Sequence, residues 1–167
     1  MYVIDLKTGA INNKTESGRG NADAKTNTAH GIGVDPEGNY VIADRSNSRL
    51  VWRNSDLSPL MIKDVNGKLK QKQLAMPGLE VCNVAFKGQY AVVPCLNASI
   101  AIIGPHPENA GHYKILSKFK MPGEYIDLGY DGIHDANFTN DLNYIVVSTW
   151  QRKKNIAPRV FVLQRQK

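Results

Sequence analysis

The chain has 167 residues, of which 42% are hydrophobic and 22% charged, and its net charge is +6. This length and composition fit one soluble globular domain and exclude a disordered chain. No apolar run approaches the roughly 20 residues that cross a bilayer, and the first residues lack the features of a signal peptide. The positive charge is scattered and forms no RNA-recognition motif, so neither a membrane nor nucleic acid is an expected partner.

The N-terminal region predicts one strand followed by a long loop. Residues 1–7 are apolar enough for a strand, and Lys-Thr-Gly at 7–9 ends it. Residues 12–28 are rich in Asn, Thr, Gly, Ser and Lys, a composition typical of loops.

Residues 30–52 predict three short strands separated by polar turns. The first alternates glycine with branched residues over 30–34, the second is an apolar run over 40–43, and the third begins at Leu50. Asp-Pro-Glu-Gly at 35–38 and a second polar segment have the residues that turns require. Short apolar or alternating runs bounded in this way indicate an antiparallel meander.

The segment after this meander is predicted to add a fourth, outer strand. Residues 59–65 are sufficiently apolar, and Asn66-Gly67 ends them with a turn. This would complete a four-stranded unit.

Two later segments repeat the same order of strands and turns. Cys82 takes the place of His30 after 52 residues, and His134 takes the same place after another 52. In the third segment Tyr144 falls on Tyr40 without a gap. The repeat therefore has a fixed length of 52 residues.

Repeats of this length built from short strands are typical of a β-propeller, whose blades are four-stranded sheets around a central channel. No stretch shows sustained helical periodicity, so we predict an all-β fold. A β-sandwich could use the same strands, but the recurring 52-residue spacing favours propeller blades. The predicted units are incomplete blade strands and loop over 1–27, then three blades over about 28–79, 80–131 and 132–167.

Within the first unit, His30-Gly-Ile-Gly-Val-Asp-Pro-Glu-Gly-Asn and Val41-Ile-Ala-Asp-Arg-Ser-Asn-Ser-Arg-Leu resemble the NHL repeat. Its usual form is His-Gly-Ile-x-Val-Asp, then Gly-Asn, then Val-Ala-Asp-x-x-Asn-x-Arg-Val. The other units match in part, with Cys82-Asn83 in the second and Ser148-Thr149 in place of Asp-Arg in the third. The resemblance implies about three NHL-type blades, the C-terminal half of a six-bladed ring that missing blades or a second copy would close.

One enzyme of this family is the peptidyl-α-hydroxyglycine α-amidating lyase, which holds zinc through histidines of alternate blades. The resemblance implies that His30 and His134 bind zinc or another divalent metal, and that Arg45 and Asp135 serve catalysis. Cys82 lies between the two histidines in the ring and could add a thiolate ligand. The third histidine would lie outside this chain.

Each of these residues also has a structural interpretation. The histidines could serve packing and hydrogen bonding, and Arg45 could bind a carboxylate or pair with Asp44 in a turn. Asp135 could orient a histidine, act as a base or cap a turn. Counting along the predicted hairpin places Cys82 opposite Cys95, which permits a disulfide, although the plainest interpretation is two buried free thiols.

Two functions follow from these observations. The first is an NHL-repeat propeller that acts as a binding platform for a protein, peptide or glycan ligand. The alternative is a metal-dependent, lyase-like enzyme with its site over the channel. We favour the platform because this chain supplies only two of the three histidines.

Overall fold

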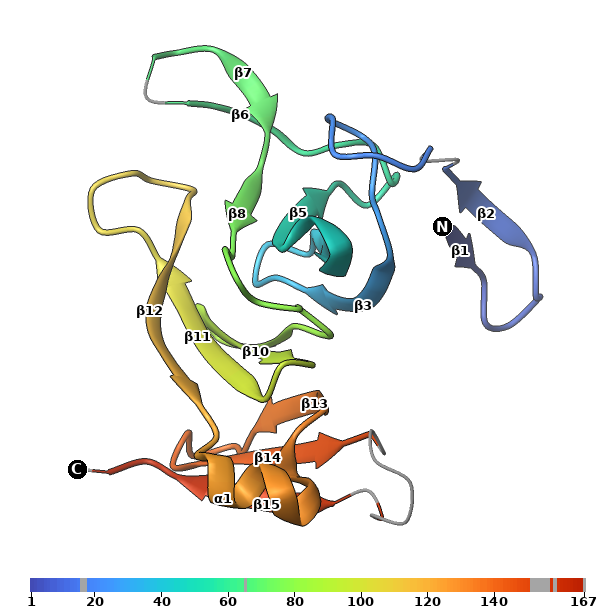
Figure 1. Cartoon of the computed structure of the whole chain (residues 1–167). Helices are drawn as coiled ribbons and strands as arrows, with labels where there is room; N and C mark the ends of the chain where they lie inside the picture. Colours follow the sequence, from blue (N-terminus) through green and yellow to red (C-terminus); the bar gives the residue numbers. More distant parts are fainter. Residues whose placement is uncertain (16–17, 65, 151–156, 158, 167) are drawn as a thin grey trace.

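The computed structural model describes residues 1–15, 18–64, 66–150, 157 and 159–166. It is an all-β structure, as predicted, with three short helical segments (Figure 1). The strands are β1 (Tyr2–Ile4), β2 (Ile11–Lys14), β3 (Ala29–Val34), β4 (Tyr40–Asp44), β5 (Arg49–Arg53), β6 (Met61–Lys63), β7 (Leu69–Gln71), β8 (Gln73–Ala75), β9 (Ala85–Lys87), β10 (Tyr90–Cys95), β11 (Ser99–Pro105), β12 (Tyr113–Lys120), β13 (Ile133–Phe138), β14 (Tyr144–Thr149) and β15 (Val160–Gln164). The helical segments are η1 (Arg45–Asn47), α1 (Gly123–Tyr125) and η2 (Ile126–Tyr130), and no helix of the described residues is long and apolar enough to span a bilayer.

Among the described residues, three antiparallel sheets of three or four strands follow one another along the chain, and two further sheets are two-stranded hairpins (Figure 1). Blade 1 has the order β3-β4-β5-β8, blade 2 has β9-β10-β11-β12, and blade 3 has β13-β14-β15. The first strand of blade 2, β9, contacts the first strands of both neighbours, β3 and β13. The first strands therefore lie on the inside, as in propeller blades.

Two apolar cores join the three blades face to face. The core between blades 1 and 2 includes Val41, Leu50, Trp52, Met76, Val84, Val93 and Ile103. The core between blades 2 and 3 includes Val92, Ile100, Met121, Ile133, Ala136 and Val147. Because successive residues of a strand point to opposite faces, β10 supplies Val93 to the first core and Val92 to the second.

The prediction that residues 59–65 form the fourth strand of blade 1 was wrong. Residues 61–63 pair with β7 in a separate hairpin, and the fourth strand is β8, which pairs with β5. Leu60 N–H donates to Trp52 O and Trp52 N–H donates to Lys72 O, so the β6–β7 hairpin projects from the sheet between residues 60 and 72. The reason is packing, since Leu74 and Met76 around β8 reach the core whereas Met61 is exposed.

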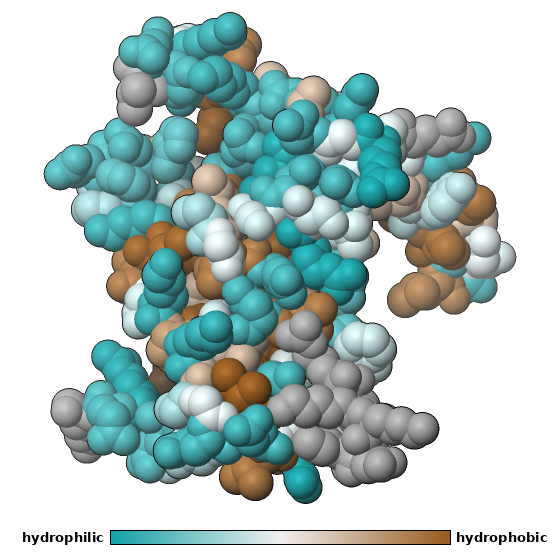
Figure 2. Space-filling model, viewed as in Figure 1, coloured by the Kyte–Doolittle hydropathy of each residue, from teal (hydrophilic) through white to brown (hydrophobic). Residues whose placement is uncertain are grey.

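The predicted loop over residues 12–28 is also only partly correct. Its first residues belong to β2, which pairs with β1 in a two-stranded hairpin. This hairpin stands apart from the blades, and Figure 2 shows hydrophobic residues on its surface. Its exposed apolar side chains are Tyr2, Ile4, Leu6 and Ile11.

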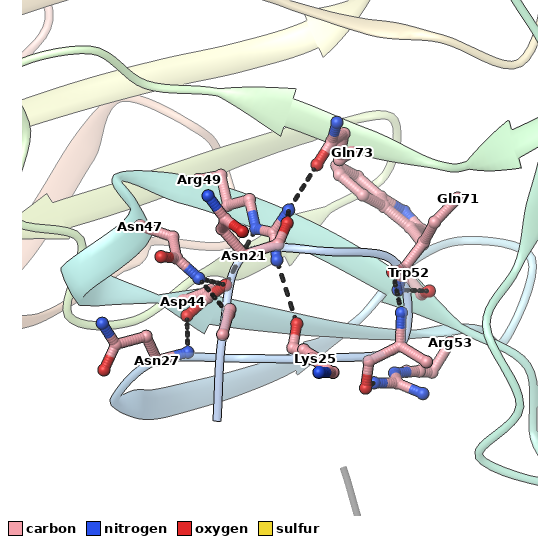
Figure 3. A network of polar contacts seen from close by, with 12 residues as sticks. Asn21, Lys25, Asn27, Asp44, Asn47, Arg49, Trp52, Arg53, Gln71 and Gln73 are labelled. Carbon is pink, nitrogen blue, oxygen red and sulfur yellow. Dashed lines mark hydrogen bonds and ion pairs between the residues drawn. The ribbon is translucent and has the colours of Figure 1, made fainter. Parts of the chain in front are cut away.

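Residues 21–27 of that loop cover part of the side of blade 1 that faces away from blade 2 (Figure 3). The buried Arg49 guanidinium donates to Asn21 O at 2.8 Å and to Lys25 O at 2.9 Å, and its Nε donates to Asp44 Oδ2 at 2.8 Å. Arg53 donates to Ala24 O at 2.7 Å. Charged side chains on the outward side of blade 1 thus bind backbone carbonyl groups of this loop.

Two glycines of β3 allow blades 1 and 2 to approach closely. A Cβ atom on Gly31 would collide with Cys82 O and Asn83, and one on Gly33 would collide with Val84 O. Any side chain at these positions would force the inner strand away from blade 2.

We therefore predict that Gly33→Ala lowers the free energy of unfolding by about 1–3 kcal/mol, because the added methyl group meets backbone that cannot move aside. Urea unfolding followed by tryptophan fluorescence measures this. Gly123→Ala is the matched control, since a Cβ there meets nothing within 4 Å, and its effect should stay below about 0.5 kcal/mol. Equal effects of the two substitutions would contradict the close-approach interpretation.

Candidate functional site

The structure brings His30 and His134 together at the inner strands, although they lie on blades 1 and 3. Their ring centroids are 4.7 Å apart, and the ring planes meet at 74°. Both side chains are half-buried. Equivalent positions two repeats apart therefore meet in space.

Blade 2 connects the two histidines through residues at the same repeat position. His30 Nδ1 lies 2.9 Å from Cys82 O, and Asn83 Nδ2 donates to Asp135 Oδ1 at 2.7 Å. A carbonyl oxygen only accepts hydrogen bonds, so Nδ1 of His30 carries the proton. When Nδ1 carries the only proton of the ring, Nε2 is a hydrogen-bond acceptor.

Arg45 adds a positive charge to this cluster. It begins η1, directly after β4, and its backbone N–H donates to Thr28 O at 3.1 Å. Burial raises the pKa of the Cys82 thiol, whereas the charge of Arg45 and a hydrogen bond from it act in the opposite direction. Arg45 thus lies close to both Cys82 and His134.

The surroundings of His134 change its pKa. Burial, the neighbouring His30 and the charge of Arg45 lower the pKa of His134 below its ordinary value of 6.5, while Asp135 opposes this shift. His134 is therefore mainly neutral at pH 7. An anion bound beside it would favour the protonated form.

The sequence did not indicate two further residues of the site. Trp150 is 58% exposed, and its ring centroid lies 6.5 Å from that of His134. Asn83 holds Asp135, as described above. An exposed tryptophan directly after a predicted strand is the one signal that could have drawn attention to this position.

The two cysteines are buried free thiols, and the predicted register between them was wrong. Phe86 does pair with Ala91, as expected, but Val81 rather than Cys82 lies opposite Cys95. The thiol of Cys82 points to Glu80 O at 3.6 Å, and burial raises the pKa of Cys95 to about 12. Both sulfurs are therefore neutral thiols at pH 7.

The described residues do not support the predicted metal site. No group of three or more His, Cys, Asp or Glu side chains among them could hold a metal ion. A catalytic zinc takes three protein ligands, and this part of the chain brings together two histidines. The donor set present does not by itself fit a zinc ion.

Comparisons with known proteins agree with this architecture. Residues 26–52 match the NHL repeat model. A protein from Lactobacillus plantarum is 18% identical with a TM-score of 0.57, over 98% of this chain and 49% of that one. A PQQ-bound aldose sugar dehydrogenase from Streptomyces coelicolor is 10% identical with a TM-score of 0.52, over 83% and 43%. At these identities the likeness shows the fold alone.

The chain spans about half the length of these solved structures, 49% and 43% of them. No curated protein matches it. The function must therefore be argued from the site itself.

The site predicts a specific effect of Arg45 on His134. Arg45→Gln should raise the pKa of His134, because a positive charge that disfavours the imidazolium is removed. An NMR titration of the histidine Cε1 protons measures this. Arg165→Gln, an exposed arginine outside the cluster, should leave the His134 titration unchanged, and an unchanged titration in Arg45→Gln would show that Arg45 does not act on His134.

Proposed function

We propose, for a chain that carries an NHL repeat and folds as NHL-type β-propeller blades, that it is a binding platform for a carboxylate-bearing ligand. The ligand would lie over the inner strands, against His30, Arg45 and His134. The meeting of these side chains from blades 1 and 3 is the observation that carries the proposal.

Arg45 is suited to bind the carboxylate. Among the described residues, the basic members of the ion pairs are Arg49, Lys70 and Lys72, not Arg45. A guanidinium binds a carboxylate through two parallel hydrogen bonds, and partial burial strengthens such a pair. The nearby Asp135 accepts from Asn83 and from the backbone N–H of Ala136 through Oδ1, and among the described residues it forms no ion pair with Arg45.

The other groups indicate what else the ligand carries. With Nδ1 donating to Cys82 O, Nε2 of His30 is the ring nitrogen that could accept from an N–H or O–H donor close to the carboxylate. The exposed ring of Trp150 offers an apolar surface next to His134. A peptide C-terminus, with its carboxylate, amide N–H and side chain, has all three features.

A metal-dependent, lyase-like activity is the second candidate, and the contact between the two histidine rings favours it. It requires at least one further ligand from outside the described residues. A metal there could polarise a substrate oxygen.

The binding proposal is tested with paired N-acetylated dipeptides that end in a free carboxylate or in an amide. The carboxylate form should bind at least about tenfold more tightly by isothermal titration calorimetry, and Arg45→Gln should remove this difference. Arg165→Gln should bind both peptides as the unchanged protein does. Equal affinity for the two peptides, or no binding of either, would contradict the proposal.

Zinc content separates the two candidates. We expect the purified chain, loaded with zinc and then gel-filtered, to retain less than one zinc per chain, because two histidines hold zinc weakly. Elemental analysis measures this. Stoichiometric zinc that is lost in His30→Ala but kept in His106→Ala, a histidine of the loop between β11 and β12, would establish the second candidate instead.

A further inference from the structure

The carboxylate of Asp135 is held through one oxygen only. Asp135 lies on β13 directly after His134, and its side chain is exposed. Oδ1 accepts from Asn83 Nδ2 at 2.7 Å and from the backbone N–H of Ala136 at 2.9 Å. Among the described residues no donor reaches Oδ2, and no ion pair includes Asp135. The carboxylate is therefore oriented, but this part of the chain does not neutralise its charge.

Other aspartates of the described residues use their carboxylates differently. Asp35 and Asp44 are buried and accept hydrogen bonds on both oxygens. Asp5 accepts on Oδ1 alone, from residues two and three positions away in its own turn. The Asn83 donor of Asp135 comes from another blade, 52 residues away. A local turn therefore does not explain why this exposed carboxylate is held in place.

Arg45 and Asp135 are opposite charges on either side of the start of blade 2. Arg45 donates a hydrogen bond to the Cys82 thiol, and Asp135 accepts one from the next residue, Asn83. The two charges shift the pKa of His134 in opposite directions, Arg45 downward and Asp135 upward. Among the described residues they form no ion pair with each other. A ligand that crosses the start of blade 2 therefore meets a positive charge on one side and a negative charge on the other.

Trp150 adds an aromatic ring on the Asp135 side. In blade 3, Asp135 pairs with Ser148, two residues before Trp150. The Trp150 ring is 58% exposed, and its centroid lies 6.5 Å from that of His134, the residue before Asp135. The face of a tryptophan ring attracts a cation and packs against the methylene groups that carry it. Together, the carboxylate and the ring suit a lysine or arginine side chain.

We infer that Asp135 selects ligands whose C-terminal residue has a positively charged side chain, lysine or arginine. The inference rests on the function proposed above, in which Arg45 binds the C-terminal carboxylate. The side chain of that residue extends across the start of blade 2 toward Asp135 and Trp150. The α-ammonium group of a free amino acid does not suit this arrangement, because it is bonded to the same carbon atom as the carboxylate and the two charges of the site lie on different blades.

The experiment compares three N-acetylated dipeptides with a free carboxylate, which end in lysine, norleucine or glutamate. By isothermal titration calorimetry at low salt, the lysine peptide should bind at least about fivefold more tightly than the norleucine peptide, which has a similar side chain without the charge. The glutamate peptide should bind most weakly. Asp135→Asn should remove the preference for lysine, and Asp135→Lys should reverse the order of the lysine and glutamate peptides.

Glu108→Gln is the matched control, because it removes one negative charge from an exposed residue in the loop between β11 and β12. It should keep the preference for lysine. In Asp135→Asn the norleucine peptide should still bind more tightly than its amide, since Arg45 is unchanged. Equal affinity for the lysine and norleucine peptides, or a preference for lysine that persists in Asp135→Asn, would overturn the inference and leave the carboxylate function standing. No binding of any peptide would overturn both.

Discussion

The structure depends on the close approach of β3 to the backbone of residues 82–84. Gly31 and Gly33 have no side chains, so the inner strand of blade 1 lies directly against blade 2. This close approach allows His30 to reach Cys82 O. It also allows the apolar faces of blades 1 and 2 to form one core. Because interiors are close-packed, a small displacement here would affect both the core and the position of His30.

A second constraint acts on the opposite side of blade 1. Asp44 and Arg49 are a buried ion pair, and Arg49 also donates to the carbonyl groups of the covering loop. A buried ion pair contributes little net stability, but leaving one member unpaired is costly, so the pair specifies how the loop lies. The same loop contains Thr28, whose carbonyl accepts from Arg45 N–H. The position of the Arg45 backbone in the candidate site therefore depends on the loop that this ion pair holds.

Equivalent positions of the repeat carry side chains of different chemistry in the three blades. The blade starts carry His30, Cys82 and His134, and the next positions carry glycine, Asn83 and Asp135. The backbone geometry is shared, so substitution at these positions changes hydrogen bonding and charge without changing the fold. Asn83 now holds Asp135, and the Cys82 carbonyl orients His30, so blade 2 supports the two histidines rather than adding a third.

The sequence by itself determined the strands of residues 30–52, the 52-residue repeat and hence the blades, because alternation, turn residues and spacing are local properties of the chain. It also indicated that His30 and His134 belong to equivalent positions. Only the tertiary structure decided that residues 73–75 complete blade 1, since an outer strand is chosen by which apolar side chains reach the core between blades. It also decided that Val81 faces Cys95, because the strand loses its regular register between residues 81 and 85. Trp150 lies beside His134 because β13 and β14 pair within blade 3, and the register of that pairing is decided by the tertiary structure.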